Sequence, residues 1–154
     1  MTDTSVSIRP ARREDVAAIV AMLADDHLGR ARERLETPLP AAYYAAFERV
    51  DRDPNLTLVV AESEGRVVGC LQLAVLAGIS SQGGVRGLLE DVRVATDCRS
   101  RGIGEQLVQW AIAEAKARGC NLVELLTHSS RVDAQRFYKR LGFAASHVGM
   151  TVRF

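Results

Sequence analysis

At 154 residues the chain is long enough for one domain with a full hydrophobic core and too short for two comfortable ones. Apolar residues make up 47% and charged residues 25% of the sequence, which is ordinary for a soluble globular protein. The net charge of +1 gives no support to a general binder of nucleic acid or of membrane surfaces. We therefore expect a single domain over residues 1–154 that has neither of these partners.

The cysteines and the N-terminal residues indicate the cellular compartment of the protein. Cys70, Cys98 and Cys120 have no metal-like spacing, and three cysteines leave at least one unpaired. This pattern fits a reducing cytosol better than a disulfide framework. The segment Met1–Ser5 lacks the basic and apolar regions of a signal peptide, and no apolar run reaches membrane length. We expect a cytoplasmic protein without a metal site.

The first half of the chain carries strand and helix patterns in turn. Apolar residues at every second position indicate strands, and apolar residues three and four apart indicate amphipathic helices. The turn Glu64-Gly65 is expected to join two strands as a hairpin. In order, we expect a strand at Val6–Ile8, a helix from Arg12 to Leu23, a weakly patterned segment from Gly29 to Glu36, a helix from Pro40 to Val50, and strands at Leu56–Ser63 and Arg66–Leu76.

The second half is organised around a strand that gives way to a helix. Val92 and Val94 alternate with polar neighbours, and apolar residues recur at helical spacing over Ile103–Ala115. Gly102 and Gly104 lie at the junction. The first turn of a helix presents free backbone N–H groups and a positive dipole end, which favour an anion. Glycine lets the backbone approach that anion closely.

Two arginines beside the junction strengthen the prediction of an anion site. Arg99 and Arg101 add charge and bidentate donors, so the local chemistry indicates a phosphate or pyrophosphate. The sequence contains no Gly-x4-Gly-Lys-Ser/Thr run, which excludes a Walker loop. The dinucleotide pattern Gly-x-Gly-x-x-Gly fails at Leu107, which disfavours a Rossmann site.

The remaining segments complete the expected architecture. Gly78–Gly87 is the most loop-like stretch, either a rim beside a site or a long connection. A buried strand is expected at Asn121–Thr127 and a helix from Val132 to Leu141. Phe143–Ala145 and Met150–Phe154 are expected to complete the sheet.

Two motifs in the second half resemble those of a known family. The segment Arg99–Gly104, which has the form Arg-x-x-Gly-x-Gly, resembles the Arg/Gln-x-x-Gly-x-Gly/Ala motif of the GNAT superfamily of N-acetyltransferases. The segment Ala134–Phe143 resembles the family's Ala-x-x-Phe-Tyr-x-x-x-Gly-Phe motif, and the opening Ile8–Pro10 is also familiar from it. The resemblance covers nearly the whole chain, although its specific motifs lie in the second half.

The resemblance implies a fold and an activity. The expected fold is a GNAT-like α/β fold with a mixed, mostly antiparallel sheet of six to seven strands and about four helices. The expected activity is transfer of an acetyl group from acetyl-CoA directly to a primary amine, and a homodimer is the family's usual habit. A small-molecule amine, an aminosugar phosphate and a protein N-terminus or lysine all stay open as acceptors. A non-catalytic acyl-CoA-binding sensor or subunit is the alternative from another class.

The resemblance also implies a set of cofactor contacts. The amides of the loop would cradle the pyrophosphate, and the main chain of the preceding strand would pair with the pantetheine as an added strand does. Many family members carry Asn where this chain has Arg131, which would add a cation near a phosphate. The expected cofactor-binding residues are Val92, Arg93, Val94, Arg99, Ser100, Arg101, Gly102, Ile103, Gly104 and Arg131.

Acetyl transfer also needs an acid for the departing CoA thiolate. Tyr138 matches the family's general-acid tyrosine. A phenol with its ordinary pKa of about 10 is protonated at neutral pH, as a proton donor must be. The alternative is a helix aromatic that packs beside Phe137 and has only a structural role.

The base that receives the amine proton is expected on the strand before the loop. Simple alternation puts Glu90 on the same face as Val92 and Val94, with Asp91 and Arg93 on the other face. A carboxylate in the middle of a sheet is costly to bury unless it is paired or faces a cavity. Glu90 is therefore the expected base, directly or through water, and Asp91 is the alternative. A structural carboxylate that Arg86 or Arg93 neutralises is the other alternative.

Overall fold

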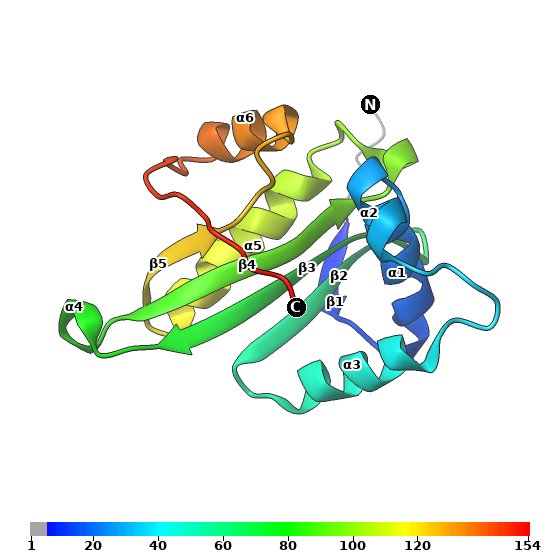
Figure 1. The fold of residues 1–154 in the computed structure, drawn as a ribbon, viewed down its shortest axis with the longest axis horizontal. Helices are drawn as coiled ribbons and strands as arrows, with labels where there is room; N and C mark the ends of the chain where they lie inside the picture. The colour runs from blue at the N-terminus through cyan, green and yellow to red at the C-terminus, as the bar shows by residue number, and fades with distance from the viewer. Residues whose placement is uncertain (1–5) are drawn as a thin grey trace.

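The computed structural model describes residues 6–154, which form one five-stranded sheet with helices on both faces (Figure 1). The mixed α/β architecture is the one expected from the sequence. In chain order the elements are β1 (Ser7–Pro10), the short 3-10 helix η1 (Arg13–Asp15), α1 (Val16–Ala24), α2 (His27–Arg32), α3 (Ala41–Arg52), β2 (Leu56–Ser63), β3 (Arg66–Ala77), α4 (Ser80–Gly83), β4 (Val85–Val94), the 3-10 helix η2 (Thr96–Cys98), α5 (Ile103–Ala117), β5 (Cys120–Leu125) and α6 (Val132–Arg140).

The sheet has the strand order β1-β2-β3-β4-β5. Neighbouring strands are antiparallel as far as β4, whereas β4 and β5 are parallel and are joined by the crossover helix α5. The pairing of β4 with β5 ends at Leu89 opposite Leu125, although β4 continues to Val94 beside β3. The two parallel strands therefore part, and the last residues of β4 have a free edge on the β5 side.

Helix α5 covers one face of the sheet with the apolar stripe that its spacing predicts. Ile103, Leu107, Ala111 and Ala115 are all buried. Gly69 of β3 lies directly beneath the helix, and a Cβ built there would stand 2.9 Å from Leu107 Cδ1. The absence of a side chain at this glycine lets the helix lie close to the sheet.

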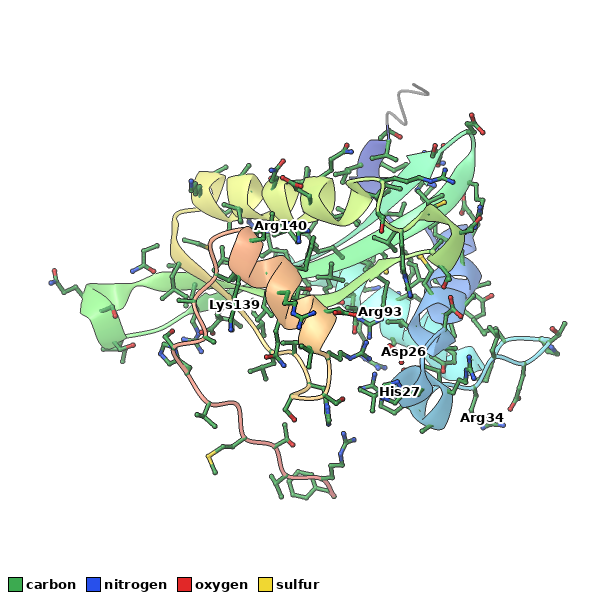
Figure 2. The ribbon with its side chains drawn as sticks, turned by 90° about the horizontal axis from the view of Figure 1, so that it is seen from above. Asp26, His27, Arg34, Arg93, Lys139 and Arg140 are labelled. Atoms are coloured by element: carbon green, nitrogen blue, oxygen red, sulfur yellow. The ribbon has the colours of Figure 1, made fainter. Side chains whose placement is uncertain are left out.

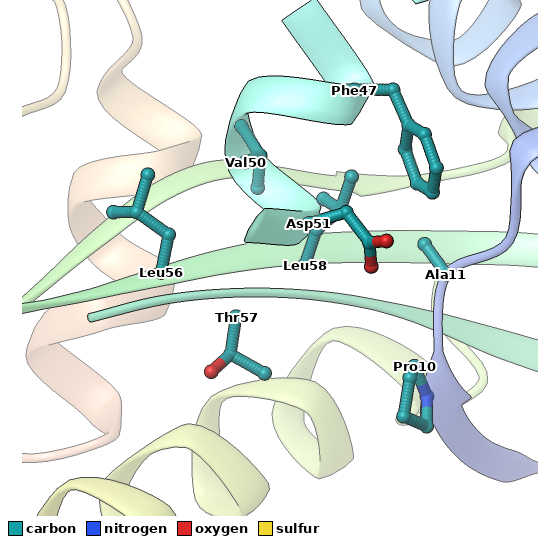
Figure 3. A pocket seen from close by; sticks show the side chains of 8 residues that line it. All are labelled: Pro10, Ala11, Phe47, Val50, Asp51, Leu56, Thr57 and Leu58. Carbon is teal, nitrogen blue, oxygen red and sulfur yellow. The ribbon is translucent and has the colours of Figure 1, made fainter. Parts of the chain in front are cut away.

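Helices α1 and α3 cover the opposite face. Helix α3 packs over β2, where Phe47 and Val50 meet Leu58 around a small pocket that Ala11 also lines (Figure 3). Figure 2 shows α5 on one side of the sheet and the N-terminal helices on the other. The three layers give each face of the sheet an apolar cover.

The expected hairpin between β2 and β3 is present. Glu64 and Gly65 have φ values of 51° and 75°. Positive φ at both central residues is the backbone of a two-residue turn whose twist matches that of the flanking strands. The sequence therefore sets the register of these two strands locally.

The C-terminal segment corrects the sequence analysis. Phe143–Ala145 and Met150–Phe154 form no strands, so the sheet has five strands where six to seven were expected. The tail instead crosses in front of the sheet (Figure 1). A strand needs a neighbouring edge for its backbone, and the tail pairs with none in this chain. Val148, Met150 and Val152 are consequently 89%, 90% and 78% exposed.

Two short helices were not expected from the sequence. The weakly patterned charged segment forms α2, and part of the Gly78–Gly87 loop forms α4, which makes six α-helices in the described residues. Helix α2 begins because the Asp26 side chain accepts a hydrogen bond from the Gly29 N–H at 2.5 Å. No helix in this part of the chain combines the length and apolar character needed to cross a membrane.

Candidate active site

Strand β4 carries a bulge just beyond the point where it leaves β5. Gln72 and Cys70 of β3 pair with Glu90 and Arg93 of β4, so β4 has one residue more between its two partners. Asp91 absorbs the extra length with a φ of 53°, in the left-handed region. Bulges redirect side chains at the places where pairing changes.

The bulge corrects the faces expected from simple alternation. Gln72 and Cys70 are alternate residues of one strand, so their partners Glu90 and Arg93 share a face of the sheet. Val94 pairs with Gly69 and lies on the α5 face. The expectation that Glu90 shares a face with Val94, opposite Arg93, is therefore wrong, because the extra residue shifts the period by one.

The loop before α5 has the conformation of an anion site. Ser100 and Gly102 have φ values of 61° and 76°, and left-handed residues of this kind build the concave backbone nests that bind anions. Gly102 is the N-cap of α5, and no side chain caps the helix there. A Cβ at Gly102 would meet no atom within 4 Å, so the loop is open at this point.

The side chains of the loop leave its backbone accessible. Arg99, Ser100 and Arg101 are exposed. The Arg99 Nε donates a hydrogen bond of 3.4 Å to the Val94 carbonyl, which ties the loop to the end of β4. Two guanidinium groups therefore stand beside an uncapped helix start, as the phosphate prediction requires.

Helix α6 lies across the opening between β4 and β5. A Cβ at Gly104 would stand 3.3 Å from Phe137 Cζ and 3.6 Å from Val94 Cγ2, so the start of α5, the end of β4 and α6 meet here. Tyr138 follows Phe137 on α6, with 5.0 Å between the ring centroids in an edge-on arrangement. The structure therefore brings Tyr138 to the same region as the loop and the free edge of β4.

Tyr138 and Glu90 have perturbed pKa values. Burial raises the pKa of Tyr138, while the positive charges of Arg93 and Arg131 oppose the rise. Burial also raises the pKa of Glu90, and the neighbouring Asp91 carboxylate adds to the effect, although the Glu90 side chain still reaches solvent. A protonated phenol and a carboxylate with raised proton affinity suit an acid and a base.

Arg131 forms an ion pair that the sequence did not indicate. Its Nη1 lies 2.5 Å from Asp26 Oδ2, which joins the N-terminus of α6 to that of α2. Burial acts to raise the pKa of Asp26, but the hydrogen bond from the Gly29 N–H and the pairing with Arg131 outweigh it and lower the pKa to about 2. Figure 2 shows Asp26 and Arg93 near one end of α6.

The Arg93 side chain forms no ion pair with Glu90 or Asp91, and Arg86 is paired with Glu124 instead. The Arg93 Nη1 donates a hydrogen bond of 2.9 Å to the Val92 carbonyl, whereas its Nε is buried without a partner. The pKa values of both Asp26 and Tyr138 respond to its charge. No local pattern marks either Asp26 or Arg93, because each gains its surroundings from distant parts of the chain.

One surface groove lies apart from the expected site residues. This groove, of about 630 Å³, runs between α1 and the ends of β3 and β4, beside Met22, Asp25 and Thr96, and it contains none of the expected site residues. Within residues 6–154, no group of three or more His, Cys, Asp or Glu side chains is arranged to hold a metal ion. The candidate site is therefore located by the parted strands, the loop before α5 and helix α6.

Comparison with known proteins identifies relatives over most of the chain. The pattern of the acetyltransferase (GNAT) family matches residues 17–143. The chain is 32% identical to the aminoalkylphosphonate N-acetyltransferase of Salmonella typhimurium over 94% of this chain and 88% of that protein. It is 31% identical to the L-methionine sulfoximine/L-methionine sulfone acetyltransferase of Pseudomonas paraeruginosa over 92% of this chain and 82% of that protein.

Solved structures share the fold. A protein of Bacillus halodurans named as a transcriptional regulator has a TM-score of 0.95 and 47% identity, covering 97% of this chain and 100% of that one. A putative acetyltransferase of Agrobacterium tumefaciens has a TM-score of 0.84 and 25% identity, covering 96% of this chain and 99% of that one.

The Asp26–Arg131 pair predicts a dependence of stability on pH. The pKa of Asp26 is about 2 in the folded chain and about 3.9 in an unfolded one. Its contribution is therefore fully present above pH 4 and is lost as the pH falls toward 2. We expect the free energy of unfolding of the wild type to fall more steeply over this interval than that of Asp26→Asn, measured by urea denaturation. Equal slopes in the two proteins would contradict the assignment.

Proposed function

The chain belongs to the acetyltransferase (GNAT) family and is an acyltransferase, and from this premise we propose that it moves an acetyl group from acetyl-CoA directly to the primary amine of a small molecule. One observation carries the proposal. The free edge of β4 leads to the uncapped start of α5, and Tyr138 stands on the helix that crosses the opening. Two relatives are named for acetylation of small molecules, which supports an acceptor of that size over a protein.

The cofactor would lie along the opening. Its pyrophosphate would accept hydrogen bonds from the backbone N–H groups of Arg99–Gly104 and charge from the two arginines. The pantetheine arm would pair with the main chain of Val92–Val94, which has no strand beside it on the β5 side. This arrangement would bring the thioester toward Tyr138. Arg131, which is engaged with Asp26, would hold α6 in position instead of meeting a phosphate.

The chemistry would proceed without an enzyme-bound intermediate. Glu90, or Asp91 in its place, would take a proton from the ammonium form of the acceptor, directly or through water. The neutral nitrogen would then attack the carbonyl carbon of the thioester, and the C–S bond would break. The thiolate would take the proton of the Tyr138 hydroxyl, which burial keeps in its protonated form by raising its pKa. The nitrogen would release its second proton as the amide forms, and that proton would return through water to the Tyr138 oxygen.

A second candidate function is an acyl-CoA-binding sensor with little catalysis. The 47% identical protein of Bacillus halodurans is named as a transcriptional regulator, which favours this alternative. Such a protein would need the loop at Gly102 but neither Glu90 nor Tyr138. We favour the enzyme because the structure holds Tyr138 beside the opening and Glu90 on the strand that borders it.

The exposed tail supports a homodimer in which each chain contributes one acetyltransferase domain. Val148, Met150, Val152 and Phe154 occupy every second position and are all largely exposed. This is the period of a strand with one apolar face. β5 is an edge strand, and edge strands accept a further strand from another chain. We propose that the tail of one copy completes the sheet of a second copy. The reducing cytoplasm would suit its three free cysteines.

Gly102→Asp tests the cofactor site. The new carboxylate would repel the pyrophosphate at the open start of α5, so we expect the affinity for acetyl-CoA, measured by calorimetry, to fall by roughly 100-fold or more. Gly119→Asp is the matched control, because Gly119 has a similar φ of 80° and equally open surroundings at the far end of α5. Equal losses in both variants, or unchanged binding in Gly102→Asp, would refute the site.

Tyr138→Phe tests the acid. Loss of the phenolic proton should lower kcat roughly 100- to 10,000-fold while acetyl-CoA binding stays within a factor of two or so. Tyr44→Phe, on α3 beneath the Arg13 guanidinium, is the control and should keep full turnover. The partner variant Glu90→Gln should abolish the acidic limb of the pH profile of kcat/KM. A Tyr138→Phe enzyme with wild-type kcat would favour the sensor.

Val152→Asp tests the dimer. A charge on the apolar face of the tail should convert a dimer to a monomer in light scattering, because it would be buried against the second copy. Thr151→Asp places the same charge on the other face and should stay dimeric. A monomeric wild type, or a dimer in both variants, would exclude the strand exchange.

A further inference from the structure

We propose that the acceptor amine also carries an anionic group, and that the Arg93 guanidinium binds this group. The inference rests on the acetyltransferase function proposed above and names the chemical class of its acceptor. The group would be a carboxylate, a phosphate or a phosphonate, which share the paired oxygens that a guanidinium recognises.

The guanidinium of Arg93 has unused hydrogen-bonding capacity. Its single hydrogen bond to the protein, in the part of the chain that is described, is the one from Nη1 to the Val92 carbonyl. Its Nε is buried with no partner, and no ion pair among residues 6–154 includes this side chain. A charged donor left unpaired in a partly buried place is costly. An anionic ligand would remove that cost.

Two other half-buried arginines, Arg9 and Arg131, have carboxylate partners. Arg9 bonds to both Asp15 and Glu62. Arg131 is paired with Asp26, whose negative charge the pairing consumes. The charge of Arg93 reaches both that neutral pair and Tyr138. No carboxylate among residues 6–154 forms an ion pair with Arg93, so its guanidinium is available to an anionic group on the molecule that enters.

The distance between Arg93 and the proposed base, Glu90, indicates how far apart the two charges of the acceptor lie. Because of the bulge, Glu90 and Arg93 lie on one face, opposite alternate residues of β3 that are about 6.5 Å apart along the strand. A carboxylate and a guanidinium at this spacing complement a short molecule with an ammonium at one end and an anion at the other. The amine would be held at Glu90 while the anion anchors the molecule at Arg93.

The proposed acceptor site and the cofactor loop lie on opposite faces of β4. Val94 lies on the α5 face, where the phosphate loop begins, whereas Arg93 lies on the opposite face, on which α1 contacts β3 and β4. The Arg93 side chain therefore points away from the pyrophosphate loop, and the anion that it binds is not that of the cofactor. Figure 2 shows Arg93 beside Asp26, which caps α2.

Steady-state kinetics on three amines of similar size test the proposal. The wild type should acetylate aminoethylphosphonate and β-alanine with a KM at least roughly tenfold below that for propylamine. Arg93→Gln should raise the KM for the two anionic amines roughly 10- to 100-fold and leave that for propylamine nearly unchanged. Arg93→Lys keeps the positive charge but lacks the paired N–H donors of a guanidinium, so its KM for the two anionic amines should be intermediate. Arg136→Gln, an exposed arginine on α6, is the matched control and should match the wild type.

Calorimetric titration of aminoethylphosphonate into each folded variant with CoA present gives the same test without turnover. Binding by the wild type that Arg93→Gln loses, with its circular dichroism spectrum retained, supports the assignment. A wild type that acetylates all three amines alike overturns the anion site and leaves the proposed function standing. A wild type that binds acetyl-CoA but acetylates none of the amines, and binds no aminoethylphosphonate, overturns both.

Discussion

Beyond Leu89, the backbone N–H and C=O groups of β4 have no neighbouring strand on the β5 side. In this structure the Val92 and Val94 carbonyls accept hydrogen bonds from the Arg93 and Arg99 side chains, and an extended ligand could take the place of these side chains along the edge. The edge leads directly to the helix start at Gly102, where further N–H groups lack a side-chain cap. One structural feature, the parting of two parallel strands, thus supplies hydrogen-bonding groups for both an extended arm and an anion. The rest of the molecule holds this opening in place.

The bulge at Asp91 sets the catalytic side of the opening. Without the extra residue, Glu90 and Arg93 would lie on opposite faces, and the α5 face would have to accept one of them among its apolar side chains. With it, both charges lie on the face away from α5 while Val94 packs toward Gly104. The left-handed backbone of a non-glycine residue is costly. The strained residue Asp91 lies at the edge of the opening, which fits a functional role.

The sequence predicts those parts of the fold whose conformation depends on residues close together in the chain. The Glu64-Gly65 turn and the buried stripe of α5 depend on neighbouring residues, and both are found as expected. The conformation of the loop at Gly102 likewise depends on the residue types within the loop. Tyr138, in contrast, is marked by the resemblance of Ala134–Phe143 to the family's motif and not by a local pattern of residue types.

The parts that escape prediction are set by distant partners. The shift of register at Asp91 exists only because β3 fixes both ends of the bulge, so simple alternation assigned Glu90 to the wrong face. Asp26 and Arg131 form an ion pair because the starts of α2 and α6 come together in space, which no spacing within either segment encodes. Strands were expected in the C-terminal tail, but a strand forms only where its backbone pairs with a neighbour, and the tail pairs with no strand of this chain.

The most direct test of the account is a crystal structure of the protein with acetyl-CoA. The account predicts the pyrophosphate against the backbone amides of Arg99–Gly104, the pantetheine paired with Val92–Val94, and the thioester sulfur within hydrogen-bond reach of the Tyr138 hydroxyl. A cofactor bound away from the parted strands, for example in the groove beside Met22, would contradict it.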